Sequence, residues 1–298
     1  MNYLAIDIGG SAIKAGIISS EGVVLSKMVQ STPMTCYEDL LDSLTTIVKW
    51  AKTLVEIKGI ALSQPCVTDQ KTGQALSEGA LIYITEKNPA KDLGEKFGLP
   101  YAAENDGNCA ALAEIWVGNG KHVNNLALVV CGTGIGGSVI IDKNIVSGKR
   151  NFAGEFGMSI MSEDENGRPL NWSELGSTLA LVLRYAKRTK TDPSTLNGKK
   201  IFELAEAGDQ EAQYCIHHFF RIFAYGVHNI QHVYDPDLIL IGGAISERPD
   251  FVAHIEDALD VLYSQMLGLM SRPTVGVCGS GNDANLIGAV YHLLHKQV

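Results

Sequence analysis

The sequence predicts an α/β protein built by duplication, in which two lobes each carry a mixed sheet with helices. The first indication is a pair of segments, residues 3–11 and 126–137, where an apolar strand runs into a glycine-rich polar turn. The second is that each turn leads into further strands, then helical periodicity, then another apolar strand. Strands separated by helices form sheets covered on both faces, and two such lobes make a cleft.

The first lobe is predicted to begin with a three-stranded meander. Its strands are the apolar runs at residues 4–8, 13–19 and 23–27, with a turn at 20–22. A helix is predicted over 39–54, because apolar residues recur there with a period near 3.6, at Leu40, Leu44, Ile47, Val48 and Ala51. Two more strands, at 57–63 and 100–104, and an alanine-rich helix at 108–116 are expected to complete this lobe.

The second lobe is predicted to repeat this order. Its meander consists of strands at residues 126–130, 138–141 and 145–148, with a turn at 142–144. A long helix is expected over 212–233, followed by a strand over 238–241. The repetition of strand, glycine turn and meander therefore indicates duplicated lobes.

Composition excludes several classes of protein. The chain has 298 residues, of which 46% are hydrophobic, and this fraction excludes disorder. Its net charge of −9 argues against a nucleic-acid partner. Residues 123–141 carry no charge, but glycines and asparagines interrupt them, so we expect two strands and no membrane partner. The six cysteines form no CxxC pair and the N-terminus has no secretory features, so we expect a cytoplasmic protein.

The glycine-rich turns predict phosphate binding. Glycines let backbone N–H groups close on an anion, and Ser11 and Thr133 add hydroxyl donors. The expected phosphate contacts are Gly9, Gly10, Ser11, Gly132, Thr133, Gly134, Gly136 and Gly137. The alternative is that they are tight turns without a ligand. Because the chain is acidic, a bound polyphosphate would depend on local dipoles and a metal ion.

Four ordered segments resemble the motifs of the ROK family of sugar kinases and sugar-responsive repressors. They are residues 7–16, 104–114, 131–137 and 154–157, and segments 238–243 and 281–289 extend the similarity over nearly the whole chain. The resemblance implies a two-lobed actin/Hsp70/hexokinase-like (ribonuclease H-like) fold with a central cleft. It places an N-terminal lobe at 1–117 and a C-terminal lobe at 118–283, with a helix at 284–298 packed back on the first. The C-terminal tail and residues 247–249 look closest to β-glucoside kinases and N-acetylmannosamine kinases.

Phosphoryl transfer from ATP needs a base for the attacking hydroxyl and donors that steady the transferred group. We assign the base to Asp106, between a predicted strand and a helix, although an aspartate there also suits a helix cap. The resemblance implies that Asp7 places Mg²⁺ through water, with a turn-stabilising role as the alternative. It also places the adenosine at Gly242 and Gly243 with part of residues 281–285. The alternative is that this glycine pair serves the packing of a helix.

Sugar recognition requires polar side chains in fixed directions. Asn105 and Asp106 are expected to hold the reacting hydroxyl and its neighbour. By resemblance, Glu155 binds hydroxyls near the anomeric end, and Gly79 lies in a substrate loop. An exposed loop residue is the alternative for Glu155. Glu174 is a candidate for the second sugar-binding glutamate of the family.

The sequence departs from the family pattern after residue 157. Met158 stands where many relatives have a histidine, and residues 159–176 contain no cysteine or histidine, so we expect no structural zinc. We expect Trp172 and Leu175 to order this loop by packing. With Met158 in place of the histidine, the sugar loses one polar contact, and a larger substituent near the anomeric carbon can be tolerated. We therefore predict a β-glucoside kinase that phosphorylates the 6-hydroxyl. Glucokinase and N-acetylmannosamine kinase are the alternatives, and Cys66, where relatives often have glycine, leaves that choice open.

Two alternatives come from other classes. One is a non-catalytic sugar-sensing protein of the same family. We expect no DNA-binding domain, because the chain begins at the strand that leads into the first glycine-rich turn. The other is a chaperone-like ATPase of the same general fold, which would not need the sugar carboxylates. A homodimer is expected by analogy with the family.

Overall fold

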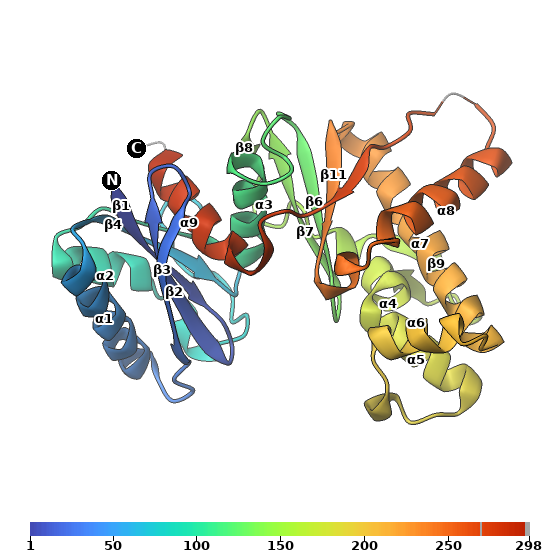
Figure 1. The fold of residues 1–298 in the computed structure, drawn as a ribbon, viewed down its shortest axis with the longest axis horizontal. Coiled ribbons are helices and arrows are strands. Elements are labelled where there is room, and N and C mark those ends of the chain that lie inside the picture. Colours follow the sequence, from blue (N-terminus) through green and yellow to red (C-terminus); the bar gives the residue numbers. More distant parts are fainter. Residues whose placement is uncertain (269, 296–298) are drawn as a thin grey trace. The chain divides into compact units, whose positions relative to one another are not determined.

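The computed structural model describes residues 1–268 and 270–295, and the chain forms two compact units (Figure 1). The first unit comprises residues 1–122, residues 145–153 and the C-terminal segment from Gly279. The second comprises residues 123–144 and 154–278. The last three residues of the helix expected at 284–298 lie outside the described residues.

The first unit is built on a five-stranded sheet with the strand order β3-β2-β1-β4-β5. The strands are β1 (Asn2–Ile8), β2 (Ala12–Ser19), β3 (Val24–Ser31), β4 (Ile57–Gln64) and β5 (Tyr101–Asn105). Strands β1 to β3 are antiparallel, which confirms the predicted meander, whereas β1, β4 and β5 are parallel. The carboxyl ends of these three parallel strands therefore meet at one edge of the sheet.

Helices cover both faces of this sheet (Figure 1). They are α1 (Tyr37–Leu54) with α2 (Pro89–Phe97) on one face, and α3 (Asp106–Trp116) with α9 (Ala284–His295) on the other. Successive side chains of β1 point to opposite faces of the sheet. Leu4 and Ile6 therefore pack with α1, whereas Tyr3 and Ala5 pack with α3 and α9. By the same alternation, Asp7 faces α3 and α9.

Helix α9 lies very close to α3 although the two are far apart in the sequence. A Cβ atom built on Gly288 would overlap the backbone oxygen of Cys109, so only glycine allows this approach. The Trp116 and Tyr291 rings also meet across the two helices, with centroids 5.6 Å apart. The packing brings the first turn of α9 to the strand edge that carries Asp7.

The second unit repeats the topology of the first, with the strand order β12-β11-β6-β7-β8. Its strands are β6 (Leu126–Cys131), β7 (Ile135–Ile141), β8 (Asn144–Ile145), β11 (Leu238–Gly242) and β12 (Val275–Val277). Strand β6 is antiparallel to β7 and parallel to β11, as β1 is antiparallel to β2 and parallel to β4. The predicted duplication is thus confirmed. The prediction of a strand over 145–148 was wrong beyond Ile145, where β8 ends. The chain turns at Gly148, where φ is +71°.

Helices and a small hairpin complete the second unit. They are the helices α4 (Trp172–Gly176), α5 (Thr178–Thr189), α6 (Gly198–Glu206), α7 (Gln210–Tyr234) and α8 (Phe251–Gln265), and the hairpin strands β9 (Ile160–Glu163) and β10 (Pro169–Asn171). Helix α7 confirms the long helix predicted over 212–233. Trp172 is buried against Phe223, with ring centroids 5.4 Å apart, and Leu175 packs on the same core, so the predicted packing of this loop is also confirmed.

Five short 3₁₀ segments lie in the described part of the chain. They are η1 (Ile82–Ile84), η2 (Phe156–Met158), η3 (Pro193–Thr195), η4 (Ala244–Glu247) and η5 (Gly281–Asp283). Among the described residues, no helix combines the length and the apolar character needed to cross a bilayer.

The close approach of α9 to α3 predicts the effect of adding one methyl group. Gly288→Ala should lower the free energy of unfolding by about 1–3 kcal/mol, because the new Cβ atom forces the two helices apart. Urea unfolding followed by circular dichroism measures this change. Asn282→Ala, an exposed change just before α9, is the control and should remain within about 0.5 kcal/mol of the original protein. Equal stability of the two variants would contradict the assigned packing.

Candidate functional site

Polar side chains line up at the carboxyl ends of the three parallel strands of the first unit. The strand register pairs Asp7 with Ser63 and Ser63 with Glu104. Paired residues of neighbouring strands point to the same face, which here is the face covered by α3 and α9. The carboxyl ends of parallel strands are the usual ligand-binding edge of an α/β sheet. This row therefore marks the candidate site in the first unit.

Asp7 is held in one orientation by two donors from distant parts of the chain. Its side chain is largely buried, and its Oδ1 accepts hydrogen bonds from Ser63 Oγ at 2.8 Å and from Asn285 Nδ2 at 3.1 Å. Within the described residues, no partner is recorded for Oδ2. The structure thus fixes the carboxylate through one oxygen and leaves the other available.

The first glycine turn follows Asp7 and is fixed through its carbonyl groups. The N–H of Gly9 donates to Ala12 O at 3.0 Å, and Thr32 Oγ1 donates to Gly9 O at 2.6 Å. The N–H of Thr32 donates to Ser11 O at 3.1 Å. No partner is recorded among the described residues for the N–H groups of Gly10 and Ser11. These two donors suit an anion.

Asp106 is the first residue of α3, and its neighbour caps the helix. Asn105 is the N-cap, since its Oδ1 accepts from Asn108 N at 3.2 Å, so the capping alternative for Asp106 is not what the structure shows. Asp106 Oδ1 accepts from Gly107 N at 2.8 Å and from Asn105 Nδ2 at 3.0 Å. No partner is recorded for Oδ2 among the described residues. The helix start therefore orients this carboxylate with one oxygen free.

The surroundings of Asp106 change the pKa of its carboxyl group. Burial raises the pKa of the Asp106 carboxyl, and the charge of Asp7 raises it further, whereas the hydrogen bonds from Gly107 and Asn105 oppose the shift. The net direction is upward. A carboxylate with a raised pKa is a better proton acceptor, which suits a general base.

Asn105 links Asp106 to the loop that carries Gly79. Its Nδ2 also donates to Cys66 O at 3.1 Å, so both amide protons are in use. Gly79 has φ +54°, and a Cβ atom there would overlap the carbonyl oxygen of Pro65. The loop around Gly79 is therefore packed on residues 65 and 66, beside the start of α3.

Glu104 is a buried carboxyl that the sequence did not single out. Its Oε1 accepts from Asn105 N at 2.7 Å and from Asn108 Nδ2 at 3.1 Å. Its Oε2 is buried without a hydrogen-bond partner, and the residue is only 1% exposed. Burial raises the pKa of Glu104 to about 7. A charged residue directly after the apolar run 101–103 of β5, at the start of segment 104–114, was the sequence signal for this group.

The second glycine turn lies at the N-terminus of α5 in the second unit. Gly132 N donates to Gly134 O at 2.9 Å, and Thr178 N donates to Gly132 O at 2.9 Å. Thr133 and Gly134 are exposed. The N-terminus of a helix carries a partial positive charge, so this turn lies where an anion is stabilised.

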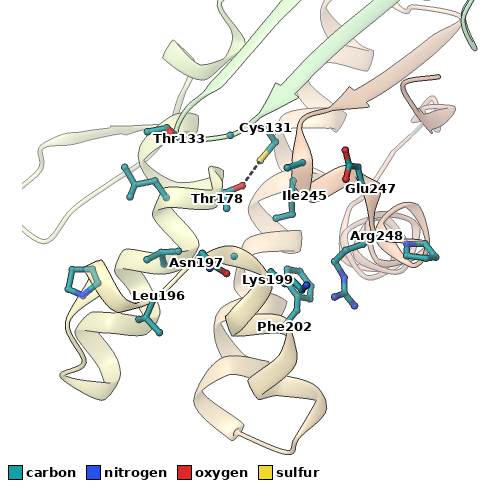
Figure 2. A pocket seen from close by; sticks show the side chains of 17 residues that line it. Cys131, Thr133, Thr178, Leu196, Asn197, Lys199, Phe202, Ile245, Glu247 and Arg248 are labelled. Atoms are coloured by element: carbon teal, nitrogen blue, oxygen red, sulfur yellow. Dashed lines mark hydrogen bonds between the residues drawn. The ribbon is translucent and has the colours of Figure 1, made fainter. Parts of the chain in front are cut away.

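A pocket of about 760 Å³ opens beside this turn, and Figure 2 shows its side chains. Thr133 lies at one end and Phe202 and Arg248 at the other. The first residues of α5 and α6 both line the pocket, so two helix N-termini face it. Most of the remaining wall is apolar, from Leu179, Val182, Pro193, Leu196, Ile245 and Pro249. This combination suits a ligand with an anionic end and a flat apolar end.

The turn Gly242-Gly243 positions one wall of the pocket. Gly243 has φ +97°, and a Cβ atom there would overlap the carbonyl oxygen of Cys131 at the end of β6. The turn carries Ala244 and Ile245 into the wall. Residues 281–285, expected with this turn, belong to the first unit, where Asn285 contacts Asp7.

Residues 154–157 pack against β7, next to the second glycine turn. A Cβ atom on Gly157 would overlap the carbonyl oxygen of Ile135, and one on Gly154 would lie 2.8 Å from Gly137 O. Between them Glu155 is exposed, and no partner is recorded for its side chain among the described residues. Met158 is 66% exposed. Close packing of the two glycines thus presents the Glu155 carboxylate to solvent.

Glu174 is already engaged in the structure. It forms a capping box with Asn171 at the start of α4, and Arg168 Nη1 donates to its Oε1 at 2.7 Å. Two separate groups of the predicted site residues therefore emerge. The first unit holds Asp7, Gly9, Gly10, Ser11, Gly79, Asn105 and Asp106, and the second holds Gly132, Thr133, Gly134, Gly136, Gly137, Glu155, Glu174, Gly242 and Gly243.

Known proteins share both the sequence and the fold. A sequence model of the ROK family matches residues 3–297. A β-glucoside kinase from Klebsiella pneumoniae is 32% identical over 294 residues, which cover 98% of this chain and 96% of the relative. A ROK family protein from Streptococcus pneumoniae TIGR4, solved in complex with sucrose, is 34% identical with a TM-score of 0.89, and 99% of each chain is covered. The Lmo2764 protein from Listeria monocytogenes, named as a candidate N-acetylmannosamine kinase, is 31% identical with a TM-score of 0.87, again over 99% of each chain.

The buried Glu104 carboxyl predicts a pH-dependent stability. Its pKa is about 7 in the folded chain and near 4.5 when unfolded, so the folded state binds more protons between these values. The free energy of unfolding should therefore fall as pH rises from 5 to 8, by up to about 3 kcal/mol from this group. Glu104→Gln removes this contribution, which urea unfolding at several pH values measures. Glu165→Gln, on an exposed turn, is the control and should keep the original slope, and an equal slope for Glu104→Gln would refute the assignment.

Proposed function

The chain belongs to the ROK family and is an ATP-dependent sugar kinase, and from this premise we propose that it phosphorylates the 6-hydroxyl of a hexoside, with a β-glucoside as the preferred substrate. The predicted fold class and the predicted kinase activity are confirmed by the relatives. The substrate proposal is supported by the β-glucoside kinase among them and by a relative that binds sucrose, itself a glycoside.

The Asp106 carboxylate carries this proposal. One oxygen is fixed by Gly107 and Asn105, while the other has no recorded partner among the described residues. Its raised pKa suits a group that takes the proton of the attacking hydroxyl as the phosphoryl group is transferred. Asn105 would hold Asp106 in this orientation and contact the sugar through the remaining lone pair of its Oδ1.

We propose that Asp7 holds Mg²⁺ through water. The residues fit this ion, because Asp7 presents one available carboxylate oxygen next to the donors of the first glycine turn, and Mg²⁺ prefers oxygen ligands and retains water. When bound, the ion would neutralise charge on the nucleotide phosphates. Ser63 and Asn285 keep the Asp7 carboxylate in place for this role.

The nucleotide is proposed to bind the two glycine turns and the pocket of the second unit. The pocket volume of about 760 Å³ lies within the range of small-molecule sites, roughly 300–1,000 Å³. We assign the phosphates to Gly9, Gly10, Ser11, Gly132, Thr133, Gly134, Gly136 and Gly137. The adenosine is assigned to the apolar end of the pocket, whose wall is positioned by Gly242 and Gly243.

For the sugar we propose Glu155 as the principal carboxylate, and Glu174 and the loop of Gly79 as further contacts. Glu155 has no recorded competing partner in the described chain, whereas Glu174 would have to release Arg168 to bind a hydroxyl. The exposed Met158 offers no hydrogen bond near the anomeric end. A thioether there would tolerate the apolar face of an aglycone or a second sugar.

We also propose a cytoplasmic homodimer. All six cysteines are free thiols, which suits a reducing compartment. The dimer is proposed by analogy with the family, and light scattering of the purified protein measures it.

The proposed base makes a direct prediction. Asp106→Asn should lower kcat by about 100-fold or more, because the amide cannot take the proton, while Asn retains the oxygen that accepts from Gly107. A coupled assay of ADP release measures kcat, and circular dichroism checks the fold. Asp42→Asn, on the exposed face of α1, is the control and should leave kcat unchanged. Near-normal turnover in Asp106→Asn would refute the catalytic assignment.

The substrate proposal is tested with cellobiose, glucose and N-acetylmannosamine. We expect kcat/KM to be about tenfold or more higher for cellobiose than for glucose, since Met158 leaves room for the second sugar. Met158→His should restore a polar contact and shift the ratio toward glucose by about tenfold. A strong preference of the original protein for free glucose would support a glucokinase instead. Sugar binding without ADP release would favour the sugar-sensing alternative.

A further inference from the structure

Arg248 stands at the apolar end of the pocket, opposite the second glycine turn (Figure 2). Its Cζ lies over the Phe202 ring, 4.1 Å from the ring centroid. Both residues line the pocket, and so do Glu247 and Pro249 on either side of Arg248. The apolar end of the pocket therefore includes an aromatic ring that rests on a guanidinium group.

Three hydrogen bonds hold the Arg248 guanidinium in its plane. Arg248 Nε donates to Asp250 Oδ1 at 3.0 Å, and Nη2 donates to Asp250 Oδ2 at 2.8 Å. Nη2 also donates to Glu206 Oε1 at 3.0 Å. The contact with Asp250 is bidentate, a geometry that fixes direction as well as distance.

These contacts join the two sides of the pocket. Phe202 and Glu206 belong to α6, and the first residues of that helix line one side. Arg248 directly follows η4, which contributes Ala244, Ile245 and Glu247 to the other side. Arg248 thus ties α6 to η4 at the end of the pocket farthest from Thr133.

A second cavity lies on the other side of the Phe202–Arg248 pair. It has a volume of about 400 Å³ and is also lined by Phe202 and Arg248, together with Phe220, Ile216 and His254. The Phe202–Arg248 pair therefore forms a wall shared by the two cavities. The Phe202 ring is only 3% exposed and also packs on Phe220, with centroids 6.2 Å apart, so it is a fixed support for the guanidinium.

The ion pairs of Arg248 are exposed enough to contribute little to overall stability. The Glu206 side chain is 63% exposed and that of Asp250 is 45% exposed. Exposed pairs of this kind add little to the free energy of folding. Their effect is therefore on the shape of the pocket rather than on the fold.

We propose that Arg248 is a positioning residue for the nucleobase. Its guanidinium, held flat on the buried Phe202 ring, forms the end wall of the pocket against which the base of ATP lies, and it does not contact the reacting atoms. This inference rests on the proposed nucleotide site. It assigns a role to Arg248, a residue that the proposed chemistry does not use.

The experiment compares Arg248→Ala with a matched control. In the control, Arg188→Ala, the removed guanidinium also lies over an aromatic ring, Tyr214, at 4.0 Å and pairs with Glu211, but it does not line the pocket. We expect Arg248→Ala to raise the KM for ATP about tenfold while kcat and the KM for the sugar stay within about twofold. Arg188→Ala should change none of the three constants.

A second probe distinguishes binding of the base from binding of the phosphates. Inorganic tripolyphosphate has no base, so its inhibition constant should be the same for Arg248→Ala and the original protein. Arg248→Lys keeps a positive charge for Asp250 but lacks the planar group. Its KM for ATP should therefore lie between the values for the original protein and for Arg248→Ala. Thermal midpoints within about 4 °C of the original protein would show that the fold is retained.

The inference is overturned if the KM for ATP is unchanged in both Arg248 variants, or if tripolyphosphate binding weakens as much as ATP binding. If Arg248→Ala does not fold, Arg248→Lys decides the question by the same two measurements. Failure of the original protein to bind ATP would instead overturn the nucleotide site and, with it, this role of Arg248.

Discussion

The row of buried polar side chains at the carboxyl ends of β1, β4 and β5 is the constraint on which the first unit depends. Burying a carboxylate is costly unless donors reach it. Ser63 and Asn285 meet this need for Asp7, whereas Asn108 meets it only in part for Glu104, whose Oε2 has no partner in the described part of the chain. Helices α3 and α9 cover the apolar strands beside this row, and each supplies one of its donors, Asn108 from α3 and Asn285 from α9.

The second unit fixes its functional groups by close backbone packing. Gly157 and Gly243 each lie against a carbonyl oxygen of the central strands or their turn, so neither position accepts a side chain. Gly157 helps to hold the chain around Glu155, and Gly243 holds the pocket wall at Ala244. The two units thus present their exposed groups on rigid backbone by different means, although their strand order is the same.

Local patterns predicted most of the strands and the long helices, because alternation and the 3.6 period are local properties. They could not predict the partners of Asp7, which lie 56 and 278 residues away along the chain. The same limit explains why Glu104 was missed, since its importance comes from burial beneath α3. Asp106 was assigned from its place before a helix, but only the structure shows that Asn105 is the cap. Arg248 gains its role from Phe202, which is on another helix.

The packing of α9 on β1 has a consequence for synthesis on the ribosome. Tyr3 and Ala5 of β1 are covered by a helix that is translated about 280 residues after this strand. Until α9 emerges, the nascent first unit exposes the part of this apolar sheet face that α9 covers, and such surfaces attract chaperones and promote aggregation. Folding of this unit is thus completed only after the whole second unit has been synthesised.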